Sequence, residues 1–530
     1  MPEQVGEFDV IVIGGGINGA GIARDAALRG LRVLLLEAND FGGGTSSWSS
    51  RLIHGGLRYL EYGEIPLVYE SLHERATLQK IAPHLVRPLR LVIPLYRDGH
   101  RARWLVRIGM LAYDLLSIGK SLPNHQMLSA DELAQLATAI NRDNLVGAAS
   151  YFDAQVSFAE RLVLENVLSA AAAGATVRNY SPVTELQLSS RGEHVVQFTD
   201  GRDGPLHEAR SPCVVNAAGP WVDQVLSQSD QDVPRLMGGT KGSHIVINTF
   251  AGGPQDALYV EAASDGRPVF MIPWNGQYLI GTTDLRYDGD ARDARASIEE
   301  VEYLLETVKK LFPDSRIGRK SVNYTYSGVR PLPYVAKGPE GAITRAHIIY
   351  RHEATGVFSI IGGKLTTYRN LAEQVVDKLQ KALNRRDQSC VTARQPLPGG
   401  ASLAAAEPID FPELSDSGQR RLRDLYGSRV SRLAEFCKND PALARVIDNR
   451  NEVLAAEVVM ALREEFARTL VDIMHRRLMI GLAADQGQSA ALAVAAVAAE
   501  ESGWDESRVE AEMTALARYN LRLREPATSD

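Results

Sequence analysis

Residues 8–37 read FDVIVIGGGINGAGIARDAALRGLRVLLLE, and this stretch predicts how the first part of the chain folds. The apolar run at 10–13 is typical of a strand that is buried on both faces of a parallel sheet. A G-x-G-x-x-G pattern follows, formed by Gly14, Gly16 and Gly19. In that spacing the glycines allow a tight turn, close approach of a pyrophosphate and close packing of the next helix on the strand. A second apolar run, 33–36, leads to Glu37, where a carboxylate can accept hydrogen bonds from an adenosine ribose.

The stretch therefore predicts a site for an ADP moiety, with the phosphates at the N-terminus of the helix, where the free N–H groups and the helix dipole favour negative charge. The motif by itself does not separate FAD from NAD. Other parts of the chain have to make that distinction.

Length and composition limit the possible classes of protein. A chain of 530 residues is expected to form two or three domains. The hydrophobic fraction of 45% and the charged fraction of 23% are those of a soluble globular protein. A net charge of −7 gives no general attraction to nucleic acid, so a small anionic substrate would need a local cluster of arginine and lysine. The three cysteines are scattered, which favours a reducing compartment and neither a disulfide framework nor a metal site.

The chain begins with an acidic segment that leads directly into the first predicted strand, so we expect no signal peptide. No run of about 20 apolar residues occurs, and the sequence therefore predicts no membrane span. Binding to a membrane surface stays open.

Residues 41–63 are rich in glycine and serine, which favours a loop that wraps a ligand over an ordinary flexible surface loop. Within it, TSSWSSRLIHGGLRYLE at 45–61, together with GGGINGAG at 14–21, resembles the FAD-dependent respiratory glycerol-3-phosphate dehydrogenases. These are part of the larger group of flavoprotein oxidoreductases that includes D-amino-acid oxidase. The resemblance is strong as far as residue 377 and looser in the remaining part.

The resemblance implies an α/β fold: a Rossmann-like FAD-binding domain of the D-amino-acid-oxidase type, an inserted antiparallel-sheet substrate domain and a C-terminal helical cap domain. Local signals agree, because Asn275-Gly276 between two apolar runs predicts a hairpin, and Ser297 with Glu300 predicts a capping box. The expected boundaries are 1–90, 150–237 and 325–390 for the FAD-binding domain, 91–149 for a helical insertion, 238–324 for the substrate-binding subdomain and 401–530 for the helical domain.

FAD is the cofactor that the resemblance implies. Residues 357–366 repeat the order strand, glycine turn and helix, and a second helix N-terminus beside a flavin would stabilise the negative charge of its reduced form. The expected cofactor-binding residues are Gly14, Gly16, Asn18, Gly19, Glu37, Thr45, Ser46, Ser47, His54, Gly55, Gly219, Gly362, Gly363, Leu365 and Thr366.

Oxidation of a secondary alcohol by hydride transfer requires a group that accepts the hydroxyl proton and donors that hold the substrate's charged end. For a phosphate these donors should be arginine and lysine. The resemblance assigns catalysis to His244, Arg330 and Lys364, and substrate binding to Arg58, Tyr59 and Arg345. Three of them have a simpler reading: His244 as a buried core histidine, Arg330 as a surface residue in a turn, and Arg345 as part of an ordinary edge strand.

The function implied is oxidation of sn-glycerol 3-phosphate to dihydroxyacetone phosphate, with electrons passing through FAD to a membrane quinone. One alternative is an oxidase that uses the same substrate and passes electrons to oxygen. A second is an amine, amino-acid or hydroxy-acid oxidoreductase of the same fold, and a different class is a nucleotide-binding module without turnover.

The C-terminal part, 405–523, is predicted to be a helical cap away from the chemistry, with Arg476 and Arg477 on a solvated face. The segment 100–120 predicts an amphipathic helix with Arg103, Arg107 and Asp114 opposite the apolar face formed by Trp104, Leu105, Ile108, Leu111, Leu115, Leu116 and Ile118. Such a helix could lie on an anionic membrane, so we expect a peripheral protein on the cytoplasmic face of the inner membrane; a helix packed on a protein core is the alternative. A homodimer stays open.

Overall fold

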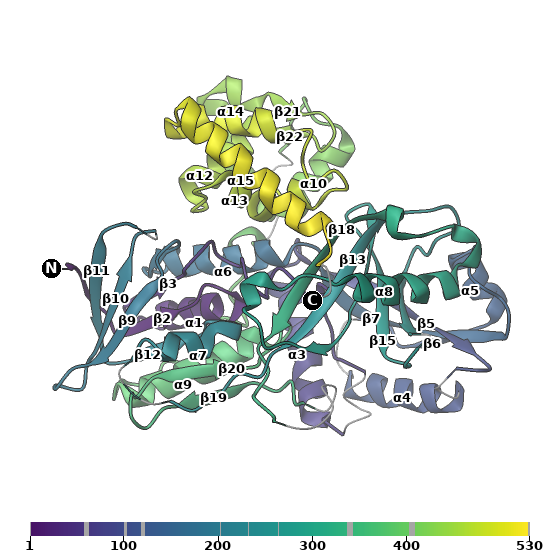
Figure 1. Cartoon of the computed structure of the whole chain (residues 1–530), viewed down its shortest axis with the longest axis horizontal. Helices are drawn as coiled ribbons and strands as arrows, with labels where there is room; N and C mark the ends of the chain where they lie inside the picture. Colours follow the sequence, from purple (N-terminus) through teal and green to yellow (C-terminus); the bar gives the residue numbers. More distant parts are fainter. Residues whose placement is uncertain are drawn as a thin grey trace.

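The computed structural model describes residues 2–57, 63–99, 103–117, 122–201, 203–229, 231, 233–262, 264–336, 343–401 and 409–527. These residues form two large sheets, of six and ten strands, two smaller sheets, and a C-terminal helical domain that lies at the top of Figure 1. The order of elements agrees with the expected α/β fold and its C-terminal helical domain.

The six-stranded sheet has the order β19-β20-β12-β2-β3-β8, and all its pairings are parallel except that of β19 with β20. Helix α1 (Ile17–Leu28) packs between α6 (Ala159–Ala172) and α9 (Tyr368–Ala382), and small residues allow this close packing. The strands come from distant parts of the chain: β2 (Val10–Ile13), β3 (Val33–Leu36), β8 (Thr176–Arg178), β12 (Val214–Asn216), β19 (Ile348–Arg351) and β20 (Phe358–Ile361).

A four-stranded sheet, order β1-β11-β10-β9, lies beside this sheet at the N-terminal side of the molecule (Figure 1). Its strands are β1 (Glu3–Glu7), β9 (Val183–Leu188), β10 (His194–Thr199) and β11 (Leu206–Ser211).

The ten-stranded sheet differs from expectation in one respect: the segment 91–149 is not a purely helical insertion. Strands β5 (Val86–Tyr96) and β7 (Leu145–Val156) pair over their whole lengths inside this sheet, and they frame α4 (Arg103–Leu116) and α5 (Ala130–Leu136). The helical period of the segment around α4 hid the two long strands on either side of it. The other strands are β4 (Leu52–Ile53), β6 (Gln126–Leu128), β13 (Thr240–Asn248), β14 (Ala257–Glu261), β15 (Pro268–Trp274), β16 (Gln277–Gly281), β17 (Leu285–Arg286) and β18 (Val322–Arg330).

Two local predictions in this sheet are confirmed. Asn275 and Gly276 join β15 to β16, and both have positive φ, 50° and 70°, as a type I′ hairpin turn requires. The capping box of α8 (Ile298–Leu311) is formed by Ser297 and Glu300.

Helix α4 is amphipathic, but the face opposite its exposed apolar side chains is not the charged one that the sequence predicted. Val106, Met110 and Tyr113 are buried there and pack on the core beside α3 (Ile65–Ile81). Asp114 accepts hydrogen bonds from the backbone and ring of His125. The helix therefore has two apolar faces, of which one is exposed. Ile118 lies outside the described residues.

The C-terminal domain, residues 409–527, shares one hydrophobic core with the ten-stranded sheet, which contains Trp274 and Tyr324 as well as Leu454 and Met474. Its elements are α10 (Asp416–Tyr426), α11 (Val430–Asn439), β21 (Val446–Asp448), β22 (Val453–Leu454), α12 (Ala455–Glu464), α13 (Leu470–Asp472), the π-helical turn η10 (Ile473–Arg477), α14 (Ala491–Ser502) and α15 (Glu506–Arg524). The prediction that Arg476 and Arg477 are solvated is wrong, because both side chains are buried at the boundary with the six-stranded sheet domain.

In the part of the chain that the structure describes, we find no helix with the length and apolarity needed to cross a bilayer.

Candidate active site

A cavity of about 1140 Å³ opens at the carboxyl ends of β2, β3 and β12 and continues along the ten-stranded sheet. It exceeds the roughly 300–1000 Å³ of ordinary small-molecule pockets, and its position beyond the strand ends is where open α/β sheets bind ligands. We call it the cofactor cavity.

The glycine turn forms one wall, and its packing explains why glycine is needed. Gly14 has a φ of +106°, and a Cβ there would lie 2.6 Å from the carbonyl oxygen of Ala217. A Cβ on Gly19 would lie 1.8 Å from the carbonyl oxygen of Gly14. The helix and the strand thus approach as closely as the dinucleotide-binding turn requires.

Glu37 lies at the same wall and accepts hydrogen bonds from the backbone N–H groups of Gly15, at 2.6 Å, and of Asn39, at 2.8 Å. Burial raises its pKa although these two bonds oppose the shift. Asn18 also lines the cavity; its amide nitrogen donates to the carbonyl of Gly362, whereas its buried Oδ1 has no hydrogen-bond partner in the described part of the chain. A glycine cradle, a fixed carboxylate and an unsatisfied polar atom all fit a bound dinucleotide.

Most of the cofactor-binding residues predicted from the sequence line this cavity: Gly14, Gly16, Asn18, Glu37, Thr45, Ser46, His54, Gly219, Gly362, Gly363, Leu365 and Thr366. Three others lie behind the wall. Gly19 packs under Gly14, the Ser47 hydroxyl donates to the carbonyl of Gly42, and the backbone N–H of Gly55 donates to Asp153. None of these three residues lines the cavity.

Two arginines that line the cavity gather around one carboxylate, that of Asp284. Arg330 donates to Asp284 Oδ1 at 2.9 Å, and Arg345 donates to Asp284 Oδ2 at 3.2 Å. Burial opposes ionisation of Asp284, but Arg330 and Arg345 outweigh it and lower its pKa. Because a Cβ on Gly242 would lie 2.2 Å from Arg330 Nη2, the glycine leaves room for this guanidinium. Both guanidinium groups line the cavity, where they can donate hydrogen bonds to an anion.

Lys364 also lines the cavity, and its ammonium donates to the Ser71 hydroxyl at 3.1 Å. Burial lowers its pKa to about 7, although Glu70 and Glu64 act in the opposite direction. Lys364 can therefore change its charge near neutral pH, which surface lysines do not.

His244 does not line the cavity. Its Nε2 lies 2.8 Å from the hydroxyl of Ser50, which does line the cavity, and its ring stacks on Tyr326 at 4.8 Å between centroids. Burial, then Arg330 and Arg51, lower the pKa of His244 to about 3, so its imidazole is neutral at pH 7. His244 is thus a buried core histidine, as the simpler reading of the sequence predicted, and it contacts a residue that lines the cavity.

Arg58 and Tyr59 lie outside the described residues. Ser50, Asp284 and Ser71 were not predicted from the sequence, and they contact His244, the two arginines and Lys364, respectively. Ser50 belongs to the quoted run TSSWSS, but nothing local distinguishes it from the other serines of that run.

Comparisons with known proteins agree with this geometry. A family model described as FAD dependent oxidoreductase matches residues 9–369, and one described as C-terminal domain of alpha-glycerophosphate oxidase matches residues 390–509. The chain is 45% identical over 535 residues to a glycerol-3-phosphate dehydrogenase of Synechocystis sp., covering 97% of this chain and 96% of that relative. It is 37% identical over 485 residues to a D-erythritol 1-phosphate dehydrogenase of Brucella abortus, covering 88% and 93%.

Among solved structures, the glycerol-3-phosphate dehydrogenase from Bacillus halodurans complexed with FAD superposes with a TM-score of 0.79. The two chains share 28% identity, and the superposition covers 99% of this chain and 96% of the other.

Proposed function

This chain belongs to the family of FAD-dependent oxidoreductases, and on that premise we propose that it oxidises sn-glycerol 3-phosphate to dihydroxyacetone phosphate. The observation that carries the proposal is that Arg330, Arg345 and Lys364 line the same cavity as the glycine turn of the dinucleotide site. In this proposal FAD is bound by the segments 1–90, 150–237 and 325–390, and the substrate is bound by the strands of 238–324.

FAD supplies the acceptor for the hydride that leaves carbon 2 of the substrate. The chain has to orient the alcohol, take its hydroxyl proton and hold the phosphate. Arg330, Arg345 and Lys364 provide the charge that holds the phosphate, together with Arg58 and Tyr59, whose assignment rests on sequence resemblance.

Ser50 and His244 together provide the route for the hydroxyl proton. The Ser50 hydroxyl lines the cavity and can accept a proton from the alcohol while it passes its own to the neutral imidazole behind it. Asp284 is a positioning residue, since it accepts hydrogen bonds from two guanidinium groups and fixes their planes.

Anaerobic addition of glycerol 3-phosphate to the purified holoenzyme tests this proposal. We expect the oxidised flavin band to bleach, whereas glycerol and D-amino acids should leave it unchanged. D-Erythritol 1-phosphate is the more stringent control, because one relative, at 37% identity, is named a D-erythritol 1-phosphate dehydrogenase. Bleaching by erythritol 1-phosphate or a D-amino acid alone would contradict the assignment of the substrate.

We further propose that the electrons pass to a membrane quinone and that the protein lies on the cytoplasmic face of an anionic membrane. Helix α4 supports this, because it exposes Trp104 by 66% and Leu115 by 68%, with Leu105, Ile108 and Leu111 between them. Arg103 and Arg107 are exposed on the same helix, where they could reach lipid phosphates.

The apolar surface continues onto α3, where Ile65 and Tyr69 are more than half exposed. In Figure 1, α3 and α4 lie at the lower edge of the molecule, opposite the C-terminal domain. A monomeric soluble protein rarely exposes so many large apolar side chains together, so contact with lipid explains the surface better than contact with water. The rival acceptor is oxygen, and a stoichiometric yield of hydrogen peroxide during turnover in air would favour it.

A further inference from the structure

Two chain segments build the wall of the cofactor cavity beyond Glu37: the loop 37–40 and the segment 179–181. They are bonded to each other, since the N–H of Tyr180 donates to the carbonyl of Asn39 at 2.8 Å and the N–H of Ser181 donates to that of Glu37 at 2.7 Å. Residues of both segments line the cavity. Because Glu37 is placed to bind a ribose, this wall belongs to the adenosine half of the site.

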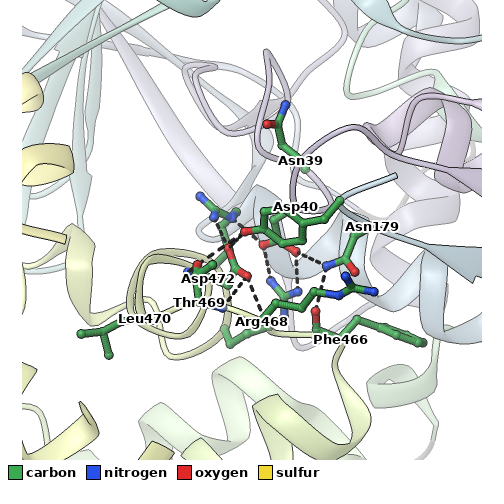
Figure 2. Close-up of polar contacts among 12 residues, drawn as sticks. Asn39, Asp40, Asn179, Phe466, Arg468, Thr469, Leu470 and Asp472 are labelled. Atoms are coloured by element: carbon green, nitrogen blue, oxygen red, sulfur yellow. Dashed lines mark hydrogen bonds and ion pairs between the residues drawn. The ribbon is translucent and has the colours of Figure 1, made fainter. Parts of the chain in front are cut away.

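The polar side chains of this wall also reach the C-terminal domain. Asp40, only 1% exposed, accepts hydrogen bonds from Arg476 Nε at 2.6 Å and from both terminal nitrogens of Arg477, at 2.7 and 2.8 Å. The Tyr180 hydroxyl donates to Asp472 at 2.7 Å. Figure 2 shows Asp40 and Asn179 facing Phe466 and Asp472 across the domain boundary.

Asp40, Asp472, Arg476 and Arg477 form a buried cluster with equal numbers of positive and negative groups. Asp472 also accepts from Arg476 at 2.6 Å, so two buried guanidinium groups meet two buried carboxylates. Burial raises the pKa of Asp40, but Arg477 and Arg476 outweigh it and hold the pKa at about 2. Removing one member would leave an uncompensated buried charge, which makes the arrangement strongly dependent on all its partners.

A second contact, between apolar side chains, reaches the glycine turn. Phe466 of the C-terminal domain meets Phe41 edge to face, with 5.8 Å between ring centroids. Phe41 in turn lies against Gly15, where a Cβ would be 2.6 Å from the ring. The C-terminal domain is therefore connected both to the adenosine wall and to the turn that holds the phosphates.

We propose that the C-terminal domain is a positioning part of the FAD site: through Asp40 and Tyr180, the residues Asp472, Arg476 and Arg477 hold the adenosine wall in its binding geometry. The contacts of this cluster and the binding of FAD are then linked, and each favours the other to the same degree. The proposal rests on the family's cofactor and is independent of the substrate and of the electron acceptor.

A matched pair of tyrosine substitutions tests it. Tyr180→Phe removes the bond to Asp472, and Tyr324→Phe removes another bond of 2.7 Å between the domains, from the Tyr324 hydroxyl to the carbonyl of Leu482. Tyr324 does not line the cofactor cavity, whereas Tyr180 does. The first measurement is the rate at which the holoenzyme releases FAD on dilution, monitored by the fluorescence of free flavin. The second is the midpoint temperature of thermal unfolding of the FAD-free full chain.

We expect both variants to lower the thermal midpoint, because both lose a bond between the domains. Tyr180→Phe should release FAD about fivefold faster or more, in the usual range of coupling between sites, whereas Tyr324→Phe should release it at the wild-type rate. Arg477→Lys, which keeps the positive charge but loses the bidentate hydrogen bonding to Asp40, should accelerate FAD release further. Equal release rates for the wild type and both tyrosine variants would overturn the proposal, whatever the substrate proves to be.

Discussion

The imidazole Nε2 of His244 lies 2.8 Å from the hydroxyl oxygen of Ser50, and of these two residues Ser50 is the one that lines the cofactor cavity. A histidine 2% exposed and stacked on Tyr326 cannot meet a substrate directly in this arrangement. In the proposed reaction the serine hydroxyl, which both donates and accepts, would connect His244 to the substrate's alcohol group.

Ser50→Ala should therefore lower kcat by about 100-fold, the lower end of what general acid–base catalysis contributes, with FAD still bound. Ser50→Thr retains a hydroxyl and should recover most of the rate. Stopped-flow reduction of the flavin by glycerol 3-phosphate measures the step directly. Normal flavin reduction in Ser50→Ala would remove Ser50 from the proton path.

The pH dependence of kcat/KM should reflect the ionisation of Lys364. Burial lowers the pKa of Lys364 to about 7, so its ammonium is charged below this pH and neutral above it. Since the ammonium is assigned to the phosphate, kcat/KM should fall as the pH rises through about 7. Lys364→Arg keeps its charge throughout and serves as the control for the ionisation of the substrate itself. A fall of the same size in that variant would assign the titration elsewhere.

Arg330→Ala should lower kcat/KM by about 100- to 1000-fold, as loss of one charged donor in an enclosed site does, while the flavin spectrum stays that of the wild type. Arg235, which pairs with Asp288 away from the cofactor cavity, gives a matched control, and Arg235→Ala should be nearly silent. Steady-state kinetics with the flavin content of each preparation check this. Comparable losses in the two variants would show that general charge matters and that the site assignment does not hold.

Helix α4 should bind lipid. Trp104→Glu combined with Leu111→Glu places two charges on the exposed apolar face, so flotation with anionic liposomes should be lost while flavin content stays constant. Leu492→Glu is the matched control, because Leu492 is 74% exposed but belongs to α14 in the C-terminal domain, and this variant should float like the wild type. If the double variant also floats like the wild type, α4 is not the membrane contact.

Truncation before Ala401 should yield protein that aggregates and retains no flavin. One hydrophobic core joins the ten-stranded sheet to the C-terminal domain, and removal of that domain exposes side chains such as Tyr324 and Trp274, both at most 3% exposed. Light scattering and flavin content of the truncated chain measure the outcome. A soluble, yellow, active fragment would contradict this expectation.

The parts of the fold that the sequence predicted are those whose signals are local. The glycine spacing at 14–19, the Asn275-Gly276 turn and the Ser297–Glu300 capping box each depend on residues within a few positions of one another. Their conformations follow from backbone sterics and nearby hydrogen bonds, and distant parts of the chain do not change them.

The errors concern pairs that are distant in sequence. Nothing in the sequence near Arg476 predicts its burial, because its partner Asp40 lies 436 positions away, and Ser50 contacts a histidine that follows 194 positions later. A local pattern of charge and hydropathy carries no information about either contact. Burial, which decides both the pairing of Arg476 and the low pKa of His244, is likewise a property of the assembled sheets.

The strand order of the six-stranded sheet has a consequence for synthesis on the ribosome. Strand β2 (Val10–Ile13) is among the first segments to emerge, but its neighbour β12 (Val214–Asn216) follows some two hundred positions later, and β20 (Phe358–Ile361) later still. The nascent chain must carry β2 and β3 with an open edge until these partners arrive, and such edges invite aggregation. We therefore expect FAD to bind only after synthesis of the chain is complete. In cells with too few chaperones, newly made chains should aggregate into inclusion bodies while enzyme that has already folded stays active.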